Sequence, residues 1–172
     1  MHSDAAGPAW LRSSLEAAPT TVKRSDQPRP TLEQFIAHAQ KWFAFLSELD
    51  FRPAPLPEGE ASNEFQTRFT NGKIILVIEG INWGFGADAY FEDTAGVRVP
   101  LVMFVPREHR ELSAEPLPSE PQQVFEIRMA AKRVREHCGD LLRGDMTRFY
   151  DRDAEWRRMT GRAHPEQKRV LP

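Results

Sequence analysis

The fold is decided by the stretch Phe65-Gln66-Thr67-Arg68-Phe69-Thr70-Asn71-Gly72-Lys73-Ile74-Ile75-Leu76-Val77-Ile78. Asn71-Gly72 lies between two strand-like runs, and an Asn-Gly pair in that position is the strongest short-range signal for a β-hairpin. The physical reason is that a two-residue type I′ turn needs positive φ at both central residues. Such a turn predicts the cross-strand pairs Thr70–Lys73, Phe69–Ile74, Thr67–Leu76 and Phe65–Ile78.

Side chains alternate between the two faces of a strand, so the hairpin predicts which residues share a face. One face carries apolar residues and one threonine, and we expect it to form the core: Phe65, Thr67, Phe69, Ile74, Leu76 and Ile78. The opposite face carries Gln66 and Arg68 on the first strand, but Ile75 and Val77 on the second. The second strand is therefore apolar on both faces, which leaves room for a packed segment, a partner or a homodimer behind it.

An amphipathic helix is predicted before the hairpin. Thr31 and Gln34 form a capping box after Pro30, and apolar residues then recur at helical spacing as far as Leu49. Pro53 ends the helix, because the residue before a proline is pushed out of the α region.

Two more strands and a final helical part are predicted after the hairpin. Residues 87–91 and 97–105 have strand character, with a turn at residues 93–96 between them. Pro100 cannot donate to a strand ladder, so it places the last strand at a sheet edge or breaks it. The following helix begins with a second capping box, Ser119 and Gln122, and ends at Gly144.

A last short helix is predicted from a cap at Asp145 to Gly161. The sequence thus predicts an α+β fold: an N-terminal helix, a four-stranded antiparallel β-meander, and one or two C-terminal helices packed on one sheet face. Residues 31–161 form one domain, between a disordered tail at residues 1–30 and a flexible tail at residues 162–172. In shape alone this layout is similar to the small α+β modules of bacterial immunity proteins and secretion chaperones, and no motif of either family matches.

Composition limits the classes of partner. The net charge is only −2, but residues 31–120 hold 7 Lys/Arg against 14 Asp/Glu, and residues 121–172 hold 12 against 8. The single cysteine, Cys138, excludes an intramolecular disulfide and suits a reducing cytosol. No run approaches the ~18 apolar residues that a membrane span requires. We therefore expect a cytoplasmic protein without a membrane partner.

Asn82, Trp83 and Phe85 are the first candidate residues for binding a partner. They lie in residues 80–86, where three glycines indicate a bend or bulge rather than a plain strand. Tryptophan is favoured at the hot spots of protein interfaces. The sequence leaves open whether Trp83 and Phe85 fill the core or reach the solvent.

Arg128, Lys132 and Arg135 are the second candidate group. They fall at i, i+4 and i+7 of the predicted second helix and therefore share one face. Such a stripe suits an acidic protein partner, and it also resembles a phosphate-contacting stripe. Glu126 and Glu136 interrupt the positive field, which disfavours nucleic acid as the partner.

Carboxylates offer the only lead toward catalysis. The predicted register places Glu64 opposite Glu79, and Asp88 follows on the next strand. Two carboxylates held close together raise the pKa of one of them, which suits acid–base chemistry in a small hydrolase. His137 and Cys138 are adjacent on a helix, so they diverge by ~100° and cannot reach one metal ion. We assign no catalytic residue, no metal ligand and no cofactor.

The sequence therefore predicts a non-catalytic protein–protein interaction module that neutralises or escorts its partner. Two alternatives remain open at this stage. One is the small hydrolase with its carboxylates near Glu64, Glu79 and Asp88, and the other is a nucleic-acid-binding accessory that uses the basic C-terminal helices.

Overall fold

The computed structural model describes residues 30–56, 65–110 and 115–161. Residues 1–29 and 162–172, which make up almost all of the two predicted tails, and Glu64 lie outside the described residues. The strands are β1 (Arg52–Pro53), β2 (Gln66–Thr70), β3 (Ile74–Ile81), β4 (Gly86–Asp93) and β5 (Arg98–Pro100). The α-helices are α1 (Leu32–Trp42), α2 (Gln122–His137), α3 (Gly139–Leu142) and α4 (Thr147–Thr160), and short 3₁₀ helices are η3 (Ala44–Leu49), η4 (Leu101–Met103) and η5 (Arg107–His109).

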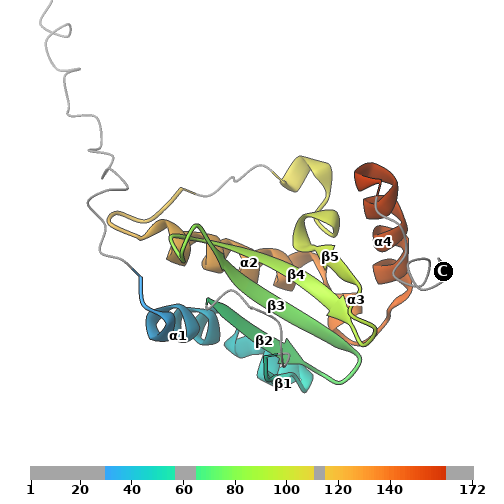
Figure 1. Ribbon diagram of the computed structural model, residues 1–172, viewed down its shortest axis with the longest axis horizontal. Coiled ribbons are helices and arrows are strands. Elements are labelled where there is room, and N and C mark those ends of the chain that lie inside the picture. Colours follow the sequence, from blue (N-terminus) through green and yellow to red (C-terminus); the bar gives the residue numbers. More distant parts are fainter. Residues whose placement is uncertain (1–29, 57–64, 111–114, 162–172) are drawn as a thin grey trace, which may run out of the picture.

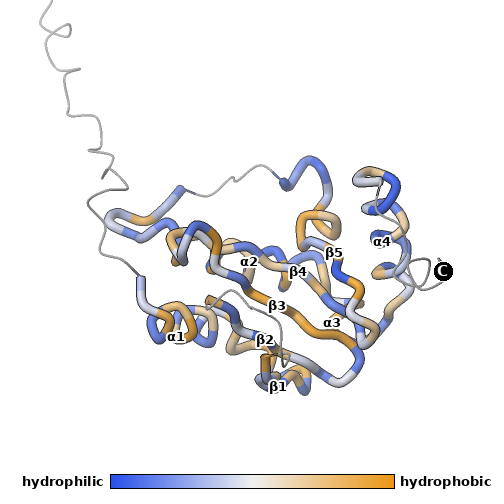
Figure 2. Tube along the Cα trace, in the orientation of Figure 1, coloured by the Kyte–Doolittle hydropathy of each residue, from blue (hydrophilic) through white to orange (hydrophobic). Residues whose placement is uncertain are grey.

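The predicted α+β class is confirmed. The strands form one antiparallel sheet in the order β1-β2-β3-β4-β5, with each strand beside its neighbour in sequence. The sheet lies in front of α2 in Figure 1, and α4 stands beyond the β5 edge. Figure 2 shows the central strand β3 as apolar along most of its length, as expected for a strand with neighbours on both sides. Among the described residues, no helix combines the length and apolar character needed to cross a membrane.

The β2–β3 hairpin forms, but the predicted register is wrong by two residues. Phe69 lies opposite Leu76 rather than opposite Ile74. Asn71 closes the turn with its side chain, because Oδ1 accepts hydrogen bonds from the backbone N–H groups two and three residues further on, at 3.1 and 3.2 Å. Only Gly72 of the pair has positive φ, at 86°, and Thr70 pairs with Ile75 rather than with Lys73, so the two-residue type I′ turn does not form.

A shift of two residues keeps every side chain on its predicted face. The face predicted as the core is buried and joins one hydrophobic cluster with the inner faces of α1 and α2. From the sheet this cluster takes Phe65, Phe69, Ile74, Leu76, Ile78 and Phe91, and from the two helices it takes Phe35, Ala39, Ile127, Ala131 and Val134. The prediction that helices cover this face is confirmed.

The first helix begins as predicted and ends earlier. Thr31 and Gln34 form the capping box, with backbone-to-side-chain hydrogen bonds of 3.1 and 3.2 Å. The α-helix stops at Trp42, and the chain continues as η3 to a left-handed Asp50 (φ 61°). This tighter path returns the chain to the sheet, where Pro53 pairs with β2 and β1 adds a fifth strand to the four predicted.

The second helix departs from the prediction at both ends. The Ser119 capping box does not form: Ser119 has φ 62°, and Pro121 precedes the helix without a side-chain cap. The helix also breaks at Cys138. The Nη1 of Arg148 donates a 2.5 Å hydrogen bond to the carbonyl oxygen of His137, which occupies an acceptor that a continuing helix would use.

The last helix forms close to its predicted bounds, whereas the last strand is much shorter than predicted. The backbone N–H of Thr147 donates to Asp145 Oδ1 at 3.0 Å at the start of α4, and Gly161 ends this helix with φ 66°. Residues 97–105 form a strand only over β5, at the edge of the sheet. After Pro100 the chain leaves the sheet so that the ring of Phe104 packs 5.3 Å from that of Phe91.

Candidate functional site

The β3–β4 loop, residues 82–85, joins its two strands through overlapping turns. Asn82 and Trp83 have φ values of 52° and 60°, and the N–H of Gly84 donates to the carbonyl oxygen of Ile81 at 3.1 Å. Positive φ at both central residues with this hydrogen bond is the pattern of a type I′ turn. The turn type predicted at Asn71-Gly72 therefore occurs here, with tryptophan at a position that favours glycine.

Trp83 is 78% exposed, the largest exposed fraction among the large apolar side chains of the described residues. A left-handed backbone costs about 1–2 kcal/mol for a residue with a Cβ. The exposed indole recovers little of this cost through packing within the fold. Asn82 is also exposed, whereas Phe85 is half-buried. The question that the sequence left open is thus answered: Trp83 reaches the solvent, and Phe85 packs in part.

Two glycines let the loop fold back on a buried phenylalanine ring. A Cβ on Gly80 would lie 2.5 Å from the Cβ of Phe65, and one on Gly84 would lie 2.7 Å from its ring. Phe65 also makes an edge contact with Phe35 of α1, with ring centroids 5.9 Å apart. The loop therefore rests on a ring that is itself anchored to the first helix.

The first turn of α2 holds the loop from another side. Gln123 is buried, and its Nε2 donates a hydrogen bond to the carbonyl oxygen of Gly84. Glu126 Oε2 accepts a 2.5 Å hydrogen bond from the N–H of Ala87, and its other oxygen accepts one of 2.6 Å from Gln122. These contacts fix the backbone on which Trp83 is presented. Neither Gln123 nor Glu126 was predicted from the sequence to hold this loop.

Two carboxylates lie behind the loop on the same sheet face as Ile81. Glu79 is directly opposite Asp88 in the β3–β4 register. The residue opposite Glu79 on β2 is Gln66, so the predicted pairing with Glu64 is wrong. Asp88 is exposed, and its Oδ1 accepts a 2.7 Å hydrogen bond from the N–H of the next residue.

The predicted cationic stripe on α2 is made of residues with local partners. Arg128 forms a two-pronged ion pair with Glu120, at 2.9 and 2.8 Å, and this hydrogen bonding lowers the pKa of the Glu120 carboxyl. Lys132 lies 3.9 Å from a glutamate one turn further on, and Arg135 stacks 4.4 Å above the ring of Phe45. Arg128 lies about one and a half turns from the helix end that holds the loop, and Arg135 more than three turns away.

The sheet face away from the core, which also carries Glu79 and Ile81, holds a buried polar network. Arg68, only 4% exposed, donates to Glu92 at 2.6 Å, and Arg98 pairs with the second oxygen of the same carboxylate at 2.8 Å. Gln66 donates to the hydroxyl oxygen of Tyr90 at 3.3 Å, and burial raises the pKa of Tyr90 to about 12. At neutral pH this tyrosine is therefore a neutral hydroxyl.

No family model, curated protein or solved structure matches this chain. Function is therefore inferred from the chemistry of the surfaces themselves.

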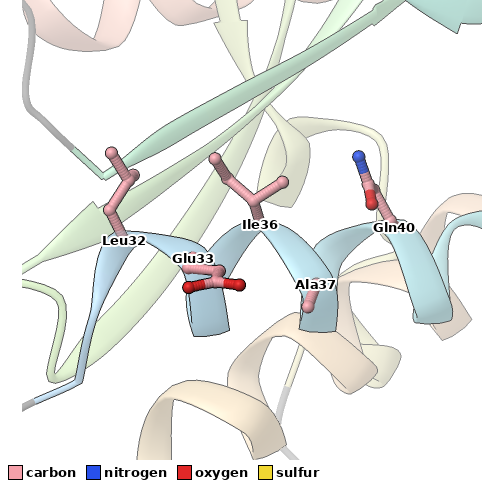
Figure 3. A pocket seen from close by; sticks show the side chains of 5 residues that line it. All are labelled: Leu32, Glu33, Ile36, Ala37 and Gln40. Carbon is pink, nitrogen blue, oxygen red and sulfur yellow. The ribbon is translucent and has the colours of Figure 1, made fainter.

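A shallow groove of about 590 Å³ runs along the outer side of α1 (Figure 3). Leu32, Ile36 and Gln40 point to one side of the helix, and Glu33 and Ala37 line the rest. Within the described part of the chain, the lining residues all belong to this one helix, and none of them comes from another element.

Histidine and cysteine do not form a reactive centre in the described part of the chain. No group of three or more His, Cys, Asp or Glu side chains there is arranged to hold a metal ion. Cys138 is fully buried, and burial raises the pKa of its thiol to about 12, so it stays protonated and a poor nucleophile at neutral pH. The rings of His109 and His137 pack against each other with centroids 5.3 Å apart.

Proposed function

We propose that this chain is a non-catalytic protein-binding module whose contact surface centres on Trp83, with Asn82 and Phe85 beside it. The observation that carries the proposal is a tryptophan that is 78% exposed and held at positive φ on a turn fixed by its neighbours. Residues kept in sparsely populated backbone regions gather at functional sites, where the strain serves the presentation of a side chain. The module is proposed to act in the cytoplasm and to neutralise or escort its partner.

The large exposed area of the Trp83 indole favours a macromolecular partner. A tryptophan buries about 150–250 Å² when it is fully enclosed, and at ~25 cal/mol per Å² the part exposed here is worth about 3–5 kcal/mol on burial. The loop is already fixed by Phe65 and by Gln123, so binding does not have to order its backbone. Preorganisation of this kind lowers the entropic cost of association.

The other candidates have weaker support. Asp88, one of the carboxylates invoked for a hydrolase, is exposed on a strand surface and accepts a hydrogen bond from its own backbone segment. Of the α2 cations, Arg128 is neutralised by Glu120, whereas Lys132 and Arg135 are exposed. We propose these cations as a secondary contact surface rather than as a nucleic-acid site.

Site-specific photo-crosslinking tests the proposal. A benzophenone amino acid is placed at Trp83 or at Tyr150, a control that is 54% exposed on α4. Crosslinking in the source cell is expected to yield the same discrete protein adduct in repeated experiments from position 83 but not from position 150. Equal adducts from both positions, or no adduct from position 83, would contradict the proposed binding surface.

A further inference from the structure

We infer that the partner presents a cationic amphipathic segment, in which a large apolar side chain is flanked by Lys or Arg. This inference rests on the proposed function and specifies the chemistry of the partner. It follows from what surrounds Trp83 at this end of the molecule.

Two further large apolar side chains are exposed on segments that form or precede the parts of the chain holding the loop. Ile81 is 42% exposed and lies two residues before Trp83, on the same strand face as Glu79. Leu117 is 58% exposed and lies in the turn that leads into α2, the helix whose first turn holds the β3–β4 loop. Exposed aliphatic side chains therefore lie both on the hairpin and on the segment before the helix that holds the loop, which suits a partner segment with an apolar face.

The charges within the hairpin itself have one sign. The β3–β4 hairpin, residues 74–93, contains four Asp/Glu residues and no Lys or Arg. Two of the four, Glu79 and Asp88, lie opposite each other directly behind the loop. Asp88 also interacts electrostatically with Arg133, whose guanidinium donates a 2.8 Å hydrogen bond to the carbonyl oxygen of Arg110.

The first turn of α2 adds to the same field. Glu126 lies against the backbone of β4, and the nearby Arg128 is paired with Glu120 through both carboxylate oxygens. The loop end is therefore acidic as well as apolar. Complementary charges speed association and exclude wrong partners, while the buried apolar anchor supplies most of the affinity.

Two synthetic peptides provide the test. One is a labelled fifteen-residue amphipathic helix of Leu and Lys with a central Phe on its apolar face, and the other replaces every Lys with Glu. Fluorescence anisotropy measures their binding to the full chain at low and at high salt. The variants are Trp83→Ala, Asp88→Lys and the milder Asp88→Asn. Asp151→Lys is the matched control, because Asp151 is exposed on α4 and its reversal changes the net charge by the same amount.

The Lys peptide is expected to bind at least tenfold more tightly than the Glu peptide, and high salt is expected to weaken it. Trp83→Ala should weaken the Lys peptide by at least tenfold. Asp88→Lys should weaken it by about fivefold, since exposed charge contacts are individually modest, and Asp88→Asn by less. Asp151→Lys should change it by less than twofold.

Several results would overturn the inference. One is equal binding of the two peptides, and another is an equal loss with Asp88→Lys and Asp151→Lys, which would show non-specific attraction. A third is Trp83-dependent self-association without peptide, which would assign the surface to a second copy of the chain. If the Glu peptide binds more tightly and still needs Trp83, the inference fails while the proposed function stands. If neither peptide binding nor photo-crosslinking depends on position 83, both fail.

Discussion

Replacing Trp83 with glycine separates the two roles that a residue can have, in folding and in binding. The substitution places Asn-Gly, the preferred type I′ pair, at the first two of the three positive-φ positions of the β3–β4 loop. It removes the left-handed strain of about 1–2 kcal/mol. Against this gain stands the greater chain entropy of glycine, about 0.5–1 kcal/mol.

The loss of packing is small because Trp83 is 78% exposed. Only about a fifth of a surface of ~150–250 Å² leaves contact with the protein, which is worth about 1 kcal/mol. These contributions nearly cancel. The free energy of unfolding of Trp83→Gly is therefore expected to stay within about 1 kcal/mol of the original chain, a shift of ~2–4 °C or less in Tm.

Urea unfolding followed by circular dichroism measures this difference, and Phe91→Ala serves as the comparison. Phe91 is fully buried, so its truncation should cost about 3–5 kcal/mol. A loss of 3 kcal/mol or more in Trp83→Gly would refute the reasoning, because it would show that the indole packs inside the fold. Unchanged stability together with lost binding of the Lys peptide would mark Trp83 as a binding residue.

Three further predictions concern the loop and the buried polar groups. Gly84→Ala should lower the free energy of unfolding by about 2–4 kcal/mol in urea titrations, because its Cβ would meet a buried ring at 2.7 Å on a backbone at φ 81°. Glu92→Ala should lower the free energy of unfolding by about 3–5 kcal/mol, because it leaves the buried Arg68 without its carboxylate. Arg98→Ala should lower it by less than about 1 kcal/mol, because the Arg98 side chain is 43% exposed. Equal losses from the two substitutions would contradict this. Burial raises the pKa of Tyr90 from 10.0 and that of Cys138 from 9.0, each to about 12. Their contribution to the stability of the fold is therefore fully present below pH 9 and is lost as the pH rises toward 12. Tm should fall over that window, and a flat Tm would contradict the burial of these groups.

The β2–β3 hairpin shows which structural features a local sequence signal can predict. Asn71-Gly72 correctly predicted where the chain turns, and strand alternation correctly predicted the core face. The register depended on the Asn71 side chain, whose Oδ1 binds the following backbone while its Nδ2 donates to the carbonyl oxygen of Leu142 at 3.1 Å. That partner is 71 residues away in sequence, so no local pattern could indicate it.

The helix ends were predictable only where the cap is local. The Thr31 capping box lies within one turn and was predicted correctly. The break at Cys138 depends on Arg148, which reaches back from α4 to the carbonyl oxygen of His137. The spacing of residues within one helix does not indicate such a contact from another helix.

The sequence predicted which segment carries the candidate site, but not the contacts that hold that segment. Three glycines around Trp83 marked an irregular segment, and those at positions 80 and 84 are required by the close approach of Phe65. The buried Gln123 that fixes the loop bonds to a residue 39 positions earlier, which sequence spacing cannot show. Likewise, the spacing of the α2 cations indicated a shared face but not that Arg128 already has a carboxylate partner.

The solvent accessibility of the Trp83 indole tests the central claim most directly. In a ¹⁵N NMR spectrum, a substitution at each tryptophan assigns its indole N–H signal, and a soluble gadolinium chelate then broadens those signals that face the solvent. We predict strong broadening for Trp83 and little for Trp42, whose Nε1 is buried. Protection of the Trp83 signal to the same degree as that of Trp42 would contradict an exposed, presented indole.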